Sequence, residues 1–219
     1  MRMRLTIIVM LVAGLALLSC GPLDHRREPI IVSQILSDPA FDGDISQDPA
    51  TAGTYTVRQG NKESVFIGID PATSVEYRAF LDFSLDWPGG APRHTNIASA
   101  TLDIVINTIQ PQPLSGTIPV RIDLVSLVSS TLVGSDFDRT LQPALATLTL
   151  HPISQADVGN HVPVDVTVLM QEAQRLQMTH FRIRILNDLG QAALGLIEIN
   201  DTTGSNRWLL APLLELRYY

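Results

Sequence analysis

Apolar and polar residues alternate along several stretches of this chain, and that pattern limits the fold more than any other feature. The clearest examples are residues 99–107, 118–124 and 181–185, where nearly every second side chain is aliphatic or aromatic and most of the others are polar. Successive side chains of a β-strand point to opposite faces, so this spacing predicts strands with one buried and one solvated face. Such strands are typical of antiparallel sheets packed on one side.

Shorter apolar segments continue the pattern, separated by clusters of Gly, Pro, Asn and Asp. We expect further strands at residues 30–36, 64–69, 77–85, 145–150, 162–166, 195–200 and 213–218. About ten strands joined by turns favour an all-β fold, namely a two-sheet antiparallel β-sandwich. The exception is residues 165–177, where the apolar spacing approaches that of a helix with Asp165 or Thr167 as its N-cap. One short helix is therefore expected.

The amino terminus has the order of an export signal. Two arginines, Arg2 and Arg4, precede an apolar run over residues 5–18, and small residues follow it. A helix over this run would be about 21 Å long, shorter than the roughly 30 Å hydrocarbon core of a bilayer. A cleaved signal peptide is therefore favoured over a permanent membrane span.

The end of this signal, Leu17-Leu18-Ser19-Cys20, resembles the lipobox of bacterial lipoproteins. The resemblance implies cleavage after Ser19 and a diacylglyceryl thioether on Cys20. Two or more acyl chains would hold the protein stably on a membrane. An ordinary secretory signal with a chance cysteine is the alternative. Because Cys20 is the only cysteine, a disulfide within the chain is excluded.

These features predict three parts: a signal peptide over residues 1–19, a lipidated tether over residues 20–29 and a single domain over residues 30–219. The expected location is the bacterial cell envelope, with the lipid membrane as a partner. Gly21 and Pro22 stand where, by resemblance to diderm lipoproteins, an aspartate would favour the inner membrane. The outer membrane is therefore the expected destination in a diderm cell.

The charge of the chain argues against nucleic acid as a partner. The formal net charge is −7, and Lys62 is the only lysine. Removal of the signal would take away two arginines and make the domain more acidic still. Proteins that bind nucleic acid depend on clustered basic residues, so this class is excluded.

Three groups of segments together resemble the DNRLRE-type domains, which are related to the family 96 carbohydrate-binding modules. They are residues 77–85 with 97–104, residues 164–171, and residues 195–199 with 211–218. The resemblance implies a β-sandwich of jelly-roll type and binding of a polysaccharide. The chain departs from the family in residues 137–150, which contain no tryptophan, and in lacking the Ser-Arg-Glu motif near the end.

A calcium site is one candidate on the residues alone. Asp42, Asp44, Ser46 and Asp48 alternate in a stretch read as a glycine-containing loop, and the three aspartates supply hard oxygen ligands that suit Ca²⁺. The EF-hand pattern is not met, because no glutamate closes a twelve-residue loop. A solvated acidic loop without an ion is the alternative.

A sugar-stacking site is the second candidate. Trp87 lies in a Pro-Gly loop, and Trp208 follows Arg207 in another loop. A sugar ring presents apolar C–H patches beside hydroxyls, so an aromatic face flanked by a hydrogen-bonding group suits it. The alternative is that each tryptophan covers the end of the core.

No motif in the sequence indicates catalysis. The five histidines lie in different segments, and none belongs to a nucleophile elbow, a zinc-protease motif or a phosphate-binding loop. We therefore predict a membrane-anchored, non-catalytic binding module whose candidate ligand is a carbohydrate. The alternative is a scaffold lipoprotein that binds an envelope protein. A hydrolase is the distant alternative.

Overall fold

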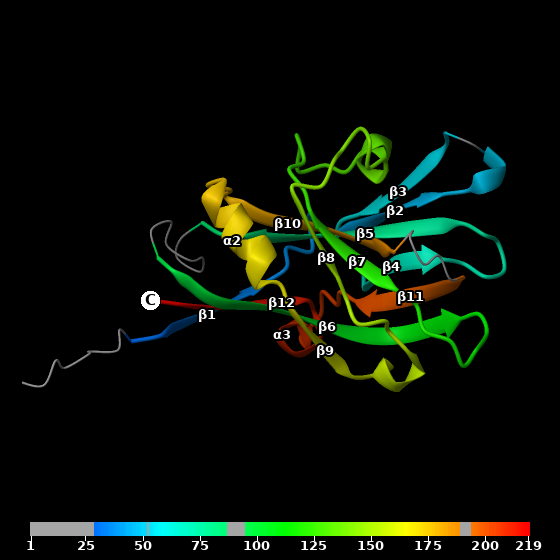
Figure 1. Cartoon of the computed structure of the whole chain (residues 1–219). Coiled ribbons are helices and arrows are strands. Elements are labelled where there is room, and N and C mark those ends of the chain that lie inside the picture. Colours follow the sequence, from blue (N-terminus) through cyan, green and yellow to red (C-terminus); the bar gives the residue numbers. More distant parts are fainter. Residues whose placement is uncertain (1–28, 52, 87–94, 189–193) are drawn as a thin grey trace, which may run out of the picture.

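The computed structural model describes residues 29–51, 53–86, 95–188 and 194–219, and in this part the chain is mostly antiparallel β-sheet (Figure 1). The described strands are β1 (Ile31–Leu36), β2 (Gly43–Gln47), β3 (Tyr55–Gln59), β4 (Ser64–Ile69), β5 (Glu76–Ser84), β6 (Ile97–Pro111), β7 (Val120–Leu124), β8 (Ala146–Thr149), β9 (His161–Asp165), β10 (His180–Asn187), β11 (Gly195–Asn200) and β12 (Leu213–Tyr218). The helices are α2 (Thr167–Arg175) and the single turn α3 (Arg207–Leu210), with short 3₁₀ turns η1 (Pro49–Thr51), η2 (Gly134–Phe137) and η3 (Gln155–Asp157).

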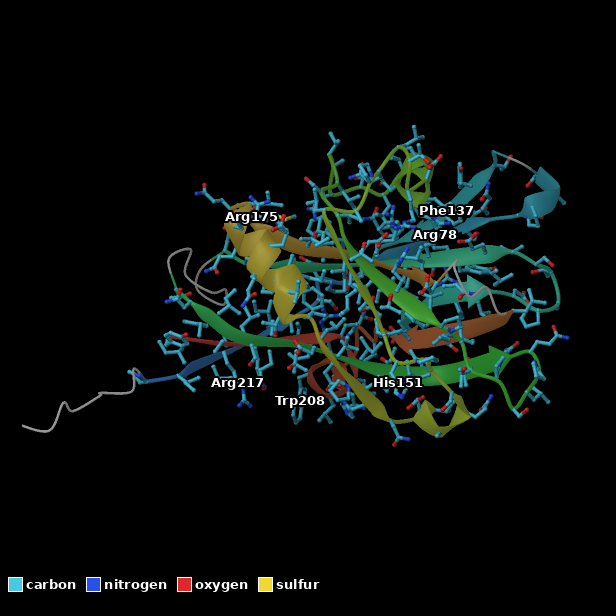
Figure 2. The ribbon with its side chains drawn as sticks, viewed as in Figure 1. Arg78, Phe137, His151, Arg175, Trp208 and Arg217 are labelled. Carbon is cyan, nitrogen blue, oxygen red and sulfur yellow. The ribbon has the colours of Figure 1, made fainter. Side chains whose placement is uncertain are left out.

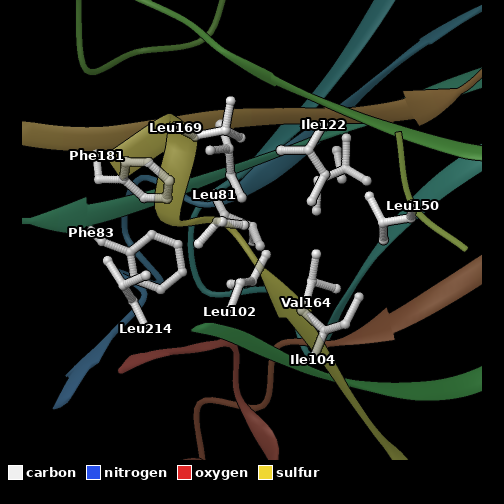
Figure 3. Close-up of a cluster of buried hydrophobic side chains, with 14 of the residues drawn as sticks. Leu81, Phe83, Leu102, Ile104, Ile122, Leu150, Val164, Leu169, Phe181 and Leu214 are labelled. Carbon is white, nitrogen blue, oxygen red and sulfur yellow. The ribbon is translucent and has the colours of Figure 1, made fainter. Parts of the chain in front are cut away.

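The strands form one curled sheet in the order β1-β12-β6-β11-β4-β5-β10-β7-β8. Outside this path, β2 pairs with both β3 and β5, and β9 pairs with β6. The first part of β6 pairs with β12, and its second part pairs with β11. The curl brings distant strands over a common core, where Leu102 of β6 and Leu214 of β12 lie in the same buried cluster as Phe181 of β10 (Figure 3). The alternating pattern therefore has one buried face, as expected.

Helix α2 covers one end of this core (Figure 1). It buries Leu169, Met170 and Ala173, which share one side of the helix. Thr167 at its first turn accepts a hydrogen bond through Oγ1 from the backbone N–H of Ala100 at 2.9 Å, so the helix start is tied to β6. Among the described residues, no helix has the length and the apolar content needed to cross a membrane.

The structure confirms the all-β prediction and the helix expected within residues 165–177. It corrects the prediction in three places. Strands β2 and β3 lie in a region read as loops and turns, and α3 lies in a region also read as a loop. Strand β2 was not predicted because Ile45 is its only large apolar residue, which is too few to show an alternating pattern.

A buried ion pair ties the sheet to the loop that carries η2. Arg184 of β10 and Asp123 of β7 are both fully buried, and Arg184 Nη2 lies 2.8 Å from Asp123 Oδ2. Arg184 Nη1 also donates to the carbonyl of Asp136 in η2 at 2.9 Å. The second oxygen of Asp123 accepts from Thr147 Oγ1 of β8 at 2.9 Å. One guanidinium and one carboxylate thus connect β7, β8, β10 and η2.

Replacement of Arg184 by methionine should destabilise the protein strongly. The variant would leave the Asp123 carboxylate buried without its main partner, and such one-sided losses cost about 3–5 kcal/mol. Urea denaturation would measure the change in the free energy of unfolding. Arg175→Met is the matched control, because the Arg175 side chain is 67% exposed in its pair with Glu172, and it should leave the stability nearly unchanged. Equal losses in the two variants would contradict the importance of the buried pair.

Candidate functional site

The predicted sugar-binding residues Trp208 and Arg207 have different surroundings in the structure. Trp208 of α3 is 68% exposed and projects from the protein (Figure 2). Its neighbour Arg207 is turned inward, where its guanidinium donates to the backbone carbonyls of Ser37 and Thr202. Trp87 and the lipidation residue Cys20 lie outside the described residues. Trp208 thus has the exposure that a stacking platform needs, whereas Arg207 mainly holds the chain around it.

The three aspartates of the predicted calcium site have separate partners. Asp44 pairs with Arg58 at 3.2 Å and accepts the N–H of Phe66. Asp48 accepts the N–H of Ala50 at 2.8 Å in a local turn. Asp42 is almost fully buried and accepts the N–H of Asp82 at 2.8 Å. Their stretch is not a loop, because residues 43–47 form β2. Within the described ranges, no group of three or more His, Cys, Asp or Glu side chains could hold a metal ion.

Instead, the fold brings Asp42 to a residue far away in the sequence, Asp201. Asp42 directly precedes β2, and Asp201 directly follows β11. Asp42 is 1% exposed and Asp201 is 0% exposed. Burial and the neighbouring Asp201 carboxylate raise the pKa of Asp42 well above its usual value. Burial raises the pKa of Asp201 to about 7, although the nearby Arg207 guanidinium opposes this shift.

Two further side chains complete this buried acidic site, defined as Ser37, Asp42, Asp201 and Arg207. Ser37 follows β1, and its buried hydroxyl is near enough to both carboxyls to lower their pKa values. The Arg207 guanidinium lies 3.9 Å from Asp201 through Nη1. This site was not predicted from the sequence, because Ser37 and Asp201 stand in turn-like segments, which are usually exposed to solvent.

A pocket of about 340 Å³ opens on another side of the protein. It is lined by Gln47, Tyr55, Arg78, Phe137, Asp138, Arg139 and Thr140. The rings of Tyr55 and Phe137 are 5.3 Å apart between centroids. The guanidinium of Arg78 lies 3.9 Å above the Phe137 ring, and Figure 2 shows these two residues side by side. We call this the aromatic pocket.

The polar groups of the aromatic pocket are held firmly. Arg78 donates through Nε to Glu76 at 2.8 Å and through Nη1 to the carbonyl of Phe137. Arg139 donates through Nε to Asp123 at 3.1 Å, which links the pocket to the buried ion pair with Arg184. These bonds fix the plane of the Arg78 guanidinium and anchor the Arg139 guanidinium through one nitrogen. The pocket therefore combines aromatic carbon with pre-positioned polar groups, as small-molecule sites generally do.

Two histidine–aspartate pairs are the arrangements most like catalytic ones among the described residues. His161 Nδ1 lies 2.7 Å from Asp103 Oδ2, in a shallow groove of about 450 Å³ across β1, β12, β6 and β9. His180 Nδ1 lies 2.7 Å from Asp82 Oδ1. A hydrolase of the serine or cysteine type would also need a nucleophile against the other ring nitrogen. No hydrogen bond from a serine, threonine or cysteine to either imidazole is present in the described ranges.

The chain matches no family model and no curated protein, so comparison with known proteins assigns it to no family.

The buried acidic site should make the metal-free protein less stable as the pH rises. The pKa of Asp201 is about 7 in the folded protein against a usual 3.8, so between these values the folded chain holds a proton that the unfolded chain releases. The stabilisation is fully present below pH 4 and lost above about pH 7. Urea denaturation at several pH values, in buffer with EDTA, would measure it. Asp201→Asn should show a shallower fall over this window, and identical slopes in the two proteins would contradict the assignment.

Proposed function

We propose that this protein is a membrane-anchored lipoprotein of the bacterial cell envelope that acts as a non-catalytic carbohydrate-binding module. The observation that carries the proposal is the aromatic pocket. The lipid would be attached at Cys20, and the outer membrane is the destination proposed for a diderm cell. The fold proposed for the domain is a two-sheet jelly roll of the DNRLRE type.

The chemistry of the aromatic pocket suits a sugar ring. Tyr55 offers an apolar face with a hydroxyl at its edge, and such a face can take up the C–H patches of a pyranose. Gln47 and Thr140 offer hydrogen-bonding groups on the rim, and Arg139 adds a guanidinium. A volume of about 340 Å³ is near the lower end of the range of ligand sites, which fits one sugar residue of a longer chain.

The positions of the resembling segments support the proposed family. Residues 77–85 with 97–104 coincide with the successive strands β5 and β6, and residues 164–171 cover the end of β9 and the start of α2. The closing segments coincide with β11 and β12. The curled antiparallel sheet is compatible with a jelly roll.

A scaffold role is the second candidate, and an exposed apolar surface favours it. Ile31 and Val32 of the edge strand β1 are 50% and 53% exposed, and Trp208 and Leu209 of α3 are exposed as well. Exposed apolar groups of this kind are used in protein–protein contacts. In that case an envelope protein, and not a polysaccharide, would be the main partner.

Loss of the Tyr55 ring should weaken carbohydrate binding strongly. We expect the full chain to bind at least one polysaccharide on a glycan array, and Tyr55→Leu to reduce that binding at least tenfold because it removes the stacking face and retains an apolar side chain. Gln47→Ala, on the pocket rim, should weaken binding less and disturb packing less. Thermal melting would confirm that each variant is folded.

Trp208→Ala is the matched control for this experiment. Retained binding in Trp208→Ala together with loss of binding in Tyr55→Leu would support the aromatic pocket as the binding site. Loss in Trp208→Ala with full binding in Tyr55→Leu would instead support the stacking platform predicted from the sequence. No binding to any envelope or environmental glycan, together with co-purification of a stoichiometric envelope protein, would favour the scaffold role.

Membrane attachment should depend on Cys20. In a bacterial host grown with a clickable palmitate analogue, the full chain should be labelled and should fractionate with membranes. Cys20→Ser should lose the label and leave the membrane fraction, because no other thiol can take the lipid. An unlabelled, soluble wild-type protein with its signal removed would contradict the lipoprotein assignment and support ordinary secretion.

A further inference from the structure

Four buried oxygen atoms meet at the buried acidic site, and no hydrogen bond of normal geometry reaches any of them, although Ser37 and the two carboxyls lie close enough to affect one another's charge. They are Ser37 Oγ, Asp42 Oδ2 and both carboxylate oxygens of Asp201. Ser37, Asp42 and Asp201 are at most 1% exposed, so bulk water does not satisfy these atoms. A buried polar atom without a partner is costly, and four in one place call for an explanation such as a bound ion.

Arg207 does not supply the missing partner. Its Nη1 is 3.9 Å from Asp201 Oδ1, too far for a hydrogen bond. Its guanidinium instead donates to the backbone carbonyls of Ser37 and Thr202. One guanidinium therefore faces two buried carboxylates, and no cationic side chain among the described residues forms an ion pair with Asp42.

The charge of the surroundings adds to this imbalance. Glu63, beside the turn that follows Asp201, accepts hydrogen bonds from the hydroxyls of Thr202 and Thr203 at 2.7 and 2.6 Å. These bonds fix the turn but leave the glutamate negative. The neighbourhood then holds three acidic groups against one arginine, so it attracts a cation.

We propose that Ser37 Oγ, Asp42 Oδ2 and the Asp201 carboxylate bind a divalent cation, Ca²⁺. All the available donors are oxygens, which is the donor set that Ca²⁺ takes, and its flexible coordination tolerates the remaining positions being filled by backbone carbonyls or water. The site differs from the one predicted from the sequence, because it uses Asp42 without Asp44 or Asp48. The observations that support it do not depend on the sugar-binding proposal.

The cation would join three parts of the chain. Ser37 lies after β1, Asp42 before β2 and Asp201 after β11. The ends of these elements are already held by Asp42 Oδ1 accepting the N–H of Asp82, and by the N–H of Asp201 donating to the carbonyl of Glu63 at 3.0 Å. The backbone therefore positions the oxygens before an ion arrives.

Calcium titration of the full chain tests the proposal. The protein is purified in mild detergent, stripped with EDTA and titrated with CaCl₂ by isothermal calorimetry, and its melting temperature is followed with and without Ca²⁺. We expect one Ca²⁺ per chain and a higher melting temperature in its presence. Asp201→Asn should weaken binding at least tenfold and remove the thermal response. The asparagine side chain has the same shape as that of aspartate but carries no charge. Ser37→Ala is a second, milder variant that should also weaken Ca²⁺ binding.

Asp44→Asn is the matched control, because Asp44 is equally buried and its partner is Arg58. This variant should bind Ca²⁺ as the wild type does. Absence of calcium binding to the wild-type chain would overturn the proposal and leave a proton as the occupant of the acid pair. Unchanged binding in Asp201→Asn, or equal loss in Asp44→Asn, would also overturn it.

Discussion

Strand β6 is the constraint on which the rest of the structure depends. It is the longest described strand, over Ile97–Pro111, and it pairs with β12 and β9 in its first part and with β11 in its second. The two parts of β6 form hydrogen bonds with different strands, and the right-handed twist accumulates along its length. A strand shared in this way therefore makes the sheet curl. The curl closes the core, and Leu102 and Ile104 of β6 lie at its centre.

Because the sheet curls around the core, some polar residues next to the ends of strands become buried. Asp42 and Asp201 both stand beside strands and would be solvated in an open sheet, yet here they meet in the interior. Asp123 and Arg184 lie within strands and are also fully buried, but they carry opposite charges and contact each other directly. Within the described ranges, Arg184 Nε is the only polar side-chain atom of this pair without a hydrogen-bond partner. The two cases differ in charge: a buried pair of opposite charges holds elements together, whereas two buried carboxyls that face each other need a proton or an ion between them.

The sequence predicted most of the strands because alternation is a local signal. It predicted α2 as well, since Leu169 and Ala173 are spaced for one helical face. It could not predict β2, because Ile45 is the only large apolar residue of that strand. It also grouped Asp42 with Asp44 and Asp48, its neighbours in sequence. The true neighbour, Asp201, is determined by tertiary structure.

Strand β2, which was not predicted from the sequence, also links the two candidate sites. Asp42 precedes β2 and belongs to the buried acidic site, while Gln47 ends β2 and lines the aromatic pocket. Five strand residues at about 3.3 Å each separate the two sites by only some 17 Å. Strand β2 is hydrogen-bonded to β5 on one side and to β3, which carries Tyr55, on the other. An ion that fixed Asp42 would therefore hold β2 in register against β5, and through β3 it would hold the aromatic face against which a ligand would lie.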